Sequence, residues 1–192
     1  MPLTKLDTTP ALIVIDLQKG IVSMPTAEPA NEIVARAAEL ARAFRARGWP
    51  VVLVNVTGAA PGRTDAGRPK MEFKDDWAEL VPELDQQPSD HLVTKQRWGA
   101  FLGTSLDHDL RQRGVTQVFL AGVATSIGVE STARSAYDLG YNVVLVLDAM
   151  TDRSADAHRH AVGTIFPRLG ETAKTDEVLK FITAGTDAPA AS

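Results

Sequence analysis

The stretch QVFLAGVATSIGVESTARSAYDLGYNVVLVLDA, residues 117–149, decides the fold. It begins and ends with apolar runs rich in Val and Leu, at 117–123 and 142–149, and the segment between them has helical spacing and ends at Gly140. Short apolar runs bounded by polar or turn residues are typical of strands buried on both faces. The stretch therefore predicts a strand, a helix and a second strand, the unit from which parallel sheets are built.

The rest of the chain repeats this alternation of strand and helix. Apolar runs of the same kind lie at 11–16, 51–56 and 91–95. Helical patterns occupy segments between the runs, and one of them ends at Gly48, a typical C-cap residue. Towards the C-terminus the pattern predicts a helix from Ser154 that Pro167 ends, an edge strand near Thr172 and a helix at 176–182. The chain therefore predicts an α/β fold with a parallel sheet covered on both faces.

Composition narrows the classes of function. With 192 residues, 44% of them hydrophobic and 23% charged, the chain predicts one domain over 1–185 and a disordered tail over 186–192. A net charge of −4 with scattered Lys and Arg predicts no nucleic-acid or membrane partner, and the first residues predict a cytoplasmic protein without a leader. The absence of cysteine excludes disulfides and a cysteine nucleophile. The long irregular segment 57–90 predicts a binding loop.

Polar residues stand where three of the apolar runs stop: Asp16, Lys95 and the group Thr125, Ser126 and Gly128. Taken singly, Asp16 and the hydroxyl residues are also typical of helix caps, and Lys95 of a solvated loop. Because the carboxyl ends of parallel strands meet at one edge of a sheet, we expect Asp16 and Lys95 to lie within contact range there. A carboxylate and an ammonium beside a strand-to-helix turn predict a pocket for acid/base chemistry.

Three motifs in this order are similar to those of the isochorismatase-like hydrolase superfamily: LIVIDLQ, VTKQRWGAF and AGVATSIGVESTARSAYDLGYNVVLVLDA. The superfamily includes nicotinamidases, carbamoylsarcosine amidases and isochorismatases. The resemblance implies a three-layer α/β/α sandwich with a six-stranded parallel sheet, a Rossmann-like fold. It implies that Asp16 and Lys95 match the catalytic Asp and Lys, and that Gly128 stands at the position of the catalytic Cys. It also implies a cis peptide bond between Val123 and Ala124.

The strand ends and the resemblance together suggest the surroundings of a bound substrate. We expect the substrate to lie beside Gln18, Arg97, Trp98, Val123, Ala124, Thr125 and Ser126. Arg63, Arg68 and Arg97 are candidate partners for a carboxylate, and Trp77 and Trp98 are candidate lid, interface or core residues. The resemblance implies a homodimer or homotetramer, with Trp98 a candidate contact. A nicotinamidase-type metal site needs two histidines after the second strand, and residues 51–68 contain none, so neither a metal nor a cofactor is expected.

Gly128 separates two kinds of chemistry within the superfamily. The amidase branch attacks with cysteine, whereas isochorismatases that cleave a vinyl ether without a covalent intermediate resemble this chain in having glycine there, although they have histidine where this chain has Ile15. The resemblance implies hydrolysis of a small anionic metabolite, with Asp16 as general acid or base assisted by Lys95. Two alternatives stay open: an inactive relative that binds a metabolite or a partner, and an amide hydrolase using water or Ser126. We expect the fold to accept cysteine at 128.

Overall fold

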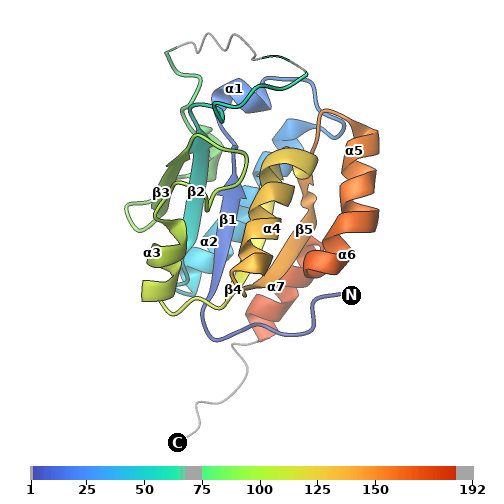
Figure 1. Cartoon of the computed structure of the whole chain (residues 1–192). Coiled ribbons are helices and arrows are strands. Elements are labelled where there is room, and N and C mark those ends of the chain that lie inside the picture. Colours follow the sequence, from blue (N-terminus) through green and yellow to red (C-terminus); the bar gives the residue numbers. More distant parts are fainter. Residues whose placement is uncertain (1, 66, 68–74, 185–192) are drawn as a thin grey trace, which may run out of the picture.

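A six-stranded parallel sheet forms the centre of the molecule (Figure 1). The computed structural model describes residues 2–65, 67 and 75–184, and the strands within them are β1 (Pro10–Ile15), β2 (Val51–Val56), β3 (His91–Lys95), β4 (Gln117–Val123), β5 (Asn142–Thr151) and β6 (Glu171–Ala173). Their order across the sheet is β3-β2-β1-β4-β5-β6, and every neighbouring pair is parallel. The expected sheet is confirmed, and β2, β3 and β4 have the predicted bounds.

Helices cover both faces of the sheet, so the molecule has three layers (Figure 1). The helices in the described part of the chain are α1 (Lys19–Val22), α2 (Ala30–Ala46), α3 (Leu106–Gln112), α4 (Glu130–Asp138), α5 (Ala155–His160), α6 (Phe166–Leu169) and α7 (Thr175–Ala184). The cores place α2 and α7 on one face and α3, α4 and α6 on the other. The α/β/α sandwich implied by the sequence is therefore confirmed.

Alternate side chains of β1 enter the two cores. Val14 packs on the side of α2, where Phe44 meets Phe119 of β4 edge to face, with 5.3 Å between the ring centroids. Ile15 packs on the side of α4. A strand buried on both faces needs a continuous apolar run rather than alternating polarity, and this explains the sequence of β1.

The predicted end of the helix that starts at Ser154 is wrong. Pro167 lies in the first turn of α6, and helical structure continues to Leu169. A π-helical turn over Ala161–Ile165 separates α5 from α6 and changes the hydrogen-bond pattern before the proline. Pro167 therefore falls where a helix needs no backbone N–H donor, and it begins the last helical turn instead of ending the helix.

The carboxyl ends of β1 and β4 meet where the strand order reverses. The sheet extends from β1 through β2 to β3 on one side and from β4 through β5 to β6 on the other. Ligands of open α/β sheets bind at such a switch point. Gly122 has a φ of 121°, and a methyl group there would overlap the Ile15 carbonyl oxygen, so glycine permits the close approach of the two strands. The expected cis peptide between Val123 and Ala124 is present.

The segment 57–90 is mainly irregular in its described part, as predicted, with a 3-10 turn at Pro82–Leu84. Leu80 forms a bridge with Gln18, and the indole of Trp77 packs against Gly20 of α1. The loop therefore lies over the chain that follows β1. The expectations for Arg68 and for the tail 186–192 fall outside the described residues.

Candidate active site

Asp16 and Lys95 form a buried ion pair at the carboxyl edge of the sheet. Lys95 Nζ donates to Asp16 Oδ2 at 2.8 Å and to the Arg97 carbonyl oxygen at 3.2 Å. The Asp16 side chain is 8% exposed and the Lys95 side chain is 2% exposed. Asp16 follows β1 and Lys95 ends β3, so the lysine side chain reaches the carboxylate across the width of β2. The predicted contact between these two residues is confirmed.

The second carboxylate oxygen of Asp16 has no hydrogen-bond partner in the described part of the chain. Oδ1 is buried and makes no hydrogen bond within the described residues. Burial raises the pKa of the Asp16 carboxyl from 3.8 to about 6, and the Lys95 ammonium only partly opposes this rise. The backbone of Asp16 has a φ of 53°, a left-handed conformation that costs a non-glycine residue about 1–3 kcal/mol. A buried carboxyl with one unpaired oxygen and this pKa is suited to proton transfer.

Gly128 lies in the π-helical turn Thr125–Val129 that joins β4 to α4. A methyl group on Gly128 would stand 3.2 Å from Asp16 Oδ2 and 3.0 Å from Ile15 Cγ2. The first distance places position 128 directly against the carboxyl of Asp16. The second is shorter than ordinary van der Waals contact, so the expectation that the fold accepts cysteine at 128 holds only if the Ile15 methyl group moves by a few tenths of an ångström.

The approach of Ile15 to position 128 can be measured with a double-mutant cycle. Gly128→Ala is expected to cost about 1–2 kcal/mol of folding free energy, because the added methyl group overpacks a buried site. Ile15→Leu removes Cγ2 and should relieve most of this cost, whereas Ile15→Val keeps Cγ2 and should relieve none. Urea unfolding of the single and double variants measures both. If Gly128→Ala lowers the folding free energy as much in Ile15→Leu as in the wild type, the close contact between Ile15 Cγ2 and position 128 is contradicted.

Thr125 and Ser126 make their hydrogen bonds on the side of the turn that faces the segment after β5. The Thr125 hydroxyl lies 2.9 Å from His158 Nδ1. The backbone N–H and the hydroxyl of Ser126 both donate to Asp152 Oδ2, at 2.7 and 2.8 Å. Within the described residues no hydrogen bond joins either hydroxyl to Asp16. Both residues therefore anchor the turn.

Asp152 and His158 were missed by the sequence reasoning. The strand before them was predicted to end at Ala149, but β5 continues to Thr151, so Asp152 directly follows a strand as Asp16 does. The rule that selected Asp16 would have selected Asp152 had the end of β5 been placed correctly. His158 lies on α5, and its sequence position alone carried no signal.

Gln18, Val123 and Ala124 surround the pair through backbone and core contacts. The Gln18 amide is fully buried, donates to the carbonyl oxygens of Val56 and Trp77, and accepts from the Val56 N–H. It ties the end of β1 to the end of β2. Val123 is buried and Ala124 is half-buried against the same core. All three lie at the carboxyl edge, where they were predicted.

Arg97 and Trp98 follow Lys95 on the surface side of the site. Arg97 is half-buried, and its guanidinium donates to the Gln96 carbonyl oxygen. Trp98 is 64% exposed and Leu102 is 68% exposed, so neither contributes to the core of the isolated chain. The homo-oligomer with Trp98 at a contact stays a prediction.

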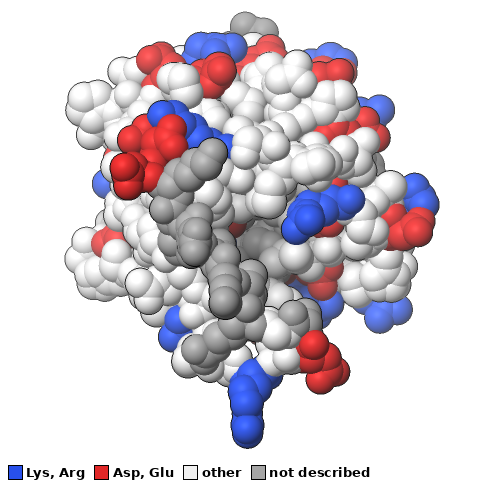
Figure 2. Space-filling view, turned by 90° about the horizontal axis from the view of Figure 1, so that it is seen from above, with Lys and Arg blue, Asp and Glu red and all other residues white. Residues whose placement is uncertain are grey.

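Among the described residues, the carboxyl edge shows no continuous area of one charge. Figure 2 looks onto this face, where Lys and Arg alternate with Asp and Glu. Within 2–65, 67 and 75–184, no three His, Asp or Glu side chains are grouped so that they could hold a metal ion. No helix in the same residues is long and apolar enough to cross a membrane.

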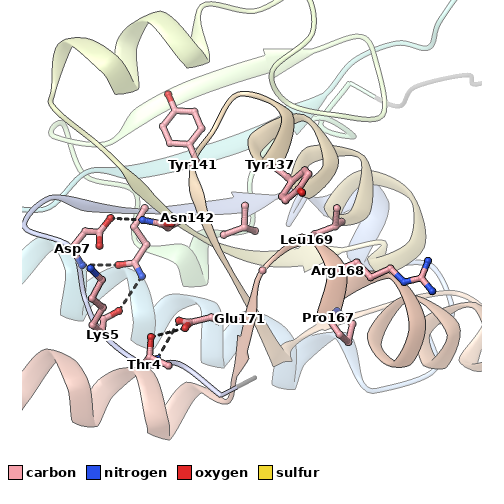
Figure 3. A pocket seen from close by; sticks show the side chains of 13 residues that line it. Thr4, Lys5, Asp7, Tyr137, Tyr141, Asn142, Pro167, Arg168, Leu169 and Glu171 are labelled. Atoms are coloured by element: carbon pink, nitrogen blue, oxygen red, sulfur yellow. Dashed lines mark hydrogen bonds between the residues drawn. The ribbon is translucent and has the colours of Figure 1, made fainter.

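A cavity of about 360 Å³ lies at the opposite edge of the sheet, where β4, β5 and β6 begin (Figure 3). Its carboxylates already have partners: Asp7 accepts from Asn142, and Glu171 accepts twice from Thr4. These bonds fasten the N-terminal segment to the sheet. The cavity contains neither Asp16 nor Lys95, so the acid/base pair belongs to the carboxyl edge alone.

Comparison with known proteins agrees with this geometry. Residues 10–177 match the family model of the isochorismatase domain. The uncharacterized isochorismatase family protein YwoC of Bacillus subtilis is 42% identical over 177 residues, which cover 88% of this chain and 92% of YwoC. The ureidoacrylate amidohydrolase RutB of Variovorax paradoxus is 33% identical over 171 residues, covering 72% of this chain and 67% of RutB.

A solved structure has the same arrangement of strands and helices. The isochorismatase family protein from Burkholderia thailandensis aligns with a TM-score of 0.90 and 45% identity, over 93% of this chain and 98% of that protein. The family match covers all six strands and the residues of the acid/base pair. The chain therefore belongs to the isochorismatase family of hydrolases.

Proposed function

We propose that the protein hydrolyses a small anionic metabolite without a covalent intermediate, and that its reaction is the cleavage of a vinyl ether of the isochorismate type. Asp16 acts as the general acid, and Lys95 holds its carboxyl in place. Glycine at position 128 adds no side chain against the carboxyl of Asp16, so that no nucleophile stands there. Neither a metal nor a cofactor takes part in these steps.

The observation that carries this proposal is the state of the Asp16 carboxyl. One oxygen is held by Lys95, and the other is buried at the switch point of the sheet with no hydrogen-bond partner among residues 2–65, 67 and 75–184. With a pKa of about 6, the carboxyl holds a proton at mildly acidic pH and releases it near neutrality. A proton on Oδ1 has no acceptor among the described residues, so a bound substrate is its natural recipient.

The proposed reaction balances with water as the co-reactant. Protonated Asp16 gives its proton to the terminal carbon of the vinyl ether, and an oxocarbenium ion forms. Water adds to the positive carbon and returns one proton to the Asp16 carboxylate. The resulting hemiketal breaks its bond to the ether oxygen and releases an alcohol and a ketone, which is pyruvate when the substrate is isochorismate. Lys95 has a third N–H beyond its two bonds, which can meet the negative charge of the substrate.

A second candidate is hydrolysis of an amide by a water molecule that Asp16 activates as a base. The relative named as a ureidoacrylate amidohydrolase favours it. Ser126 is a poorer nucleophile candidate, because its hydroxyl donates to Asp152 and no hydrogen bond joins it to Asp16 in the described part of the chain. The two reactions need opposite protonation states of Asp16, so they are separable by pH.

The pH dependence of kcat/KM decides between these roles. For vinyl ether cleavage we expect kcat/KM to be level below the Asp16 pKa of about 6 and to fall about tenfold per pH unit above it, because only the protonated acid reacts. Isochorismate supplies the vinyl ether, with pyruvate as the measured product, and ureidoacrylate supplies the amide, with ammonia as the measured product. A rate that rises through pH 6 would assign the base role to Asp16, and a rate independent of pH from 4 to 8 would remove Asp16 from proton transfer.

A further inference from the structure

Asp152 is a buried carboxylate that the proposed reaction does not use. It directly follows β5 and is 3% exposed. Its Oδ2 accepts from both the backbone N–H and the hydroxyl of Ser126, at 2.7 and 2.8 Å, and its Oδ1 accepts from the Ser154 N–H at 3.2 Å. Its carbonyl oxygen accepts from the Ala27 N–H. Asp152 is therefore held in place by its bonds with Ser154 and Ala27, in addition to the two bonds that it accepts from Ser126.

The element that Asp152 holds is the turn carrying Gly128. Ser126 and Gly128 belong to the same five-residue π-helical turn, so a displacement of one moves the other. Thr125 in this turn has a second anchor, the ring of His158. On its other side, the turn brings position 128 to the carboxyl of Asp16. The turn thus lies between two carboxylates: Asp152 anchors it through Ser126, and Asp16 packs against it at position 128.

We propose that Asp152 is a positioning residue for the active site: by holding Ser126 it keeps the turn packed against Asp16 and so keeps that carboxyl buried from bulk solvent in the substrate-free protein. The catalytic consequence of this role rests on the proposed function, whereas the structural consequence for Asp16 does not. If Asp152 is lost, the turn has one anchor fewer, water reaches Asp16, and its carboxyl titrates closer to an ordinary aspartate.

The chain contains a matched control with the same bond pattern. Asp148 of β5 accepts from both the N–H and the hydroxyl of Thr175, at 2.8 and 2.9 Å. Thr175 begins α7, on the face of the sheet opposite α4. Removing Asp148 takes away the same kind of side-chain anchor, together with an ion pair to Arg36 at 3.8 Å, but does not touch the turn at 125–129.

The experiment measures the pKa of Asp16 by carboxyl ¹³C NMR in the full chain without substrate, with Asp16→Asn used to assign the signal. In Asp152→Ala we expect the Asp16 pKa to fall from about 6 towards 3.8, and in Asp148→Ala we expect it to stay at about 6. Ser126→Ala, which keeps the backbone bond, should give a smaller fall. Asp152→Asn keeps an oxygen for Ser126 and should restore much of the shift. With an identified substrate, Asp152→Ala should lower kcat about 100-fold.

The outcomes separate this proposal from the proposed reaction. An Asp16 pKa that stays at about 6 in Asp152→Ala would overturn the positioning role, whether or not the enzyme cleaves a vinyl ether. Should Asp152→Ala fail to fold, Ser126→Ala carries the test, and an Asp16 pKa that stays at about 6 in this variant would overturn the role equally. A pKa that falls as much in Asp148→Ala as in Asp152→Ala would also overturn it, because the effect would then be general loosening.

Discussion

Replacing Lys95 by methionine is expected to destabilise the protein by about 3–5 kcal/mol at pH 8. Methionine nearly fills the volume of lysine, so the loss reflects the charge rather than a cavity. The carboxyl of Asp16, only 8% exposed, would keep a negative charge without its ammonium partner. Protonation of Asp16 removes the unpaired buried charge in the variant, so the pKa of Asp16 should rise above its present value of about 6.

The sign of the pH dependence follows from the raised pKa. In the folded protein Asp16 binds its proton more tightly than in the unfolded chain, so the stability from its protonated form is complete below pH 3.8 and is lost as the pH rises through about 6. In Lys95→Met this loss extends to higher pH. Urea unfolding at pH 5 and pH 8 should therefore show a larger gap between wild type and variant at pH 8.

The matched control for this charge effect is Lys180→Met. Lys180 pairs with Asp176 at 3.1 Å, but the two side chains are 76% and 65% exposed. Exposed pairs of this kind contribute little to stability because water and salt screen their charges, so the control should unfold close to the wild type at both pH values. If Lys95→Met lowers the free energy of unfolding as little as Lys180→Met does, the ion pair between Asp16 and Lys95 is not buried in solution.

The second large effect concerns activity. Asp16→Asn is expected to lower kcat/KM by about 10²–10⁴-fold, because an amide can accept from Lys95 but has no acidic proton to give. Its pH profile should lose the fall above pH 6 that belongs to the wild-type carboxyl. Product formation from isochorismate or ureidoacrylate measures both quantities.

Asp148→Asn serves as the control for Asp16→Asn. Asp148 is also an aspartate of the sheet, but its carboxylate binds Thr175 and does not contact Lys95. Its rate and pH profile should match the wild type. Residual activity in Asp16→Asn near the wild-type level would show that another group moves the proton.

Much of the fold was readable from the sequence because buried parallel strands are short apolar runs with sharp ends. Three strands have their predicted bounds, and Asp16 after β1, Lys95 at the end of β3 and Gly128 in the turn after β4 meet at one edge. Asp16 and Lys95 were found because a charge that follows such a run stands out from its neighbours. Their contact follows from the strand order, which brings the carboxyl ends of these strands together.

The remaining features depend on contacts that a linear pattern does not contain. A π-helical turn before Pro167 places that proline in the first turn of α6, so it does not end the helix as predicted. The closeness of the Ile15 methyl group to position 128 depends on how β1 packs against the turn, and the role of Asp152 depends on the true end of β5. Gln18 was predicted to meet the substrate, but its amide is occupied by the backbone of Val56 and Trp77.

The glycine at position 128 also bears on how the proposed site responds to oxidants such as peroxide. A cysteine thiolate at a reacting centre is oxidised by peroxide to sulfenic acid and then to forms that are not readily reversed. In this chain position 128, where the resemblance would place the catalytic cysteine, has no side chain, and the sequence contains no cysteine. The groups that remain, a carboxyl and an ammonium, do not take part in that oxidation. Under the proposed mechanism, peroxide should therefore leave the reacting groups of this site unmodified, unlike those of a site that depends on a cysteine thiolate.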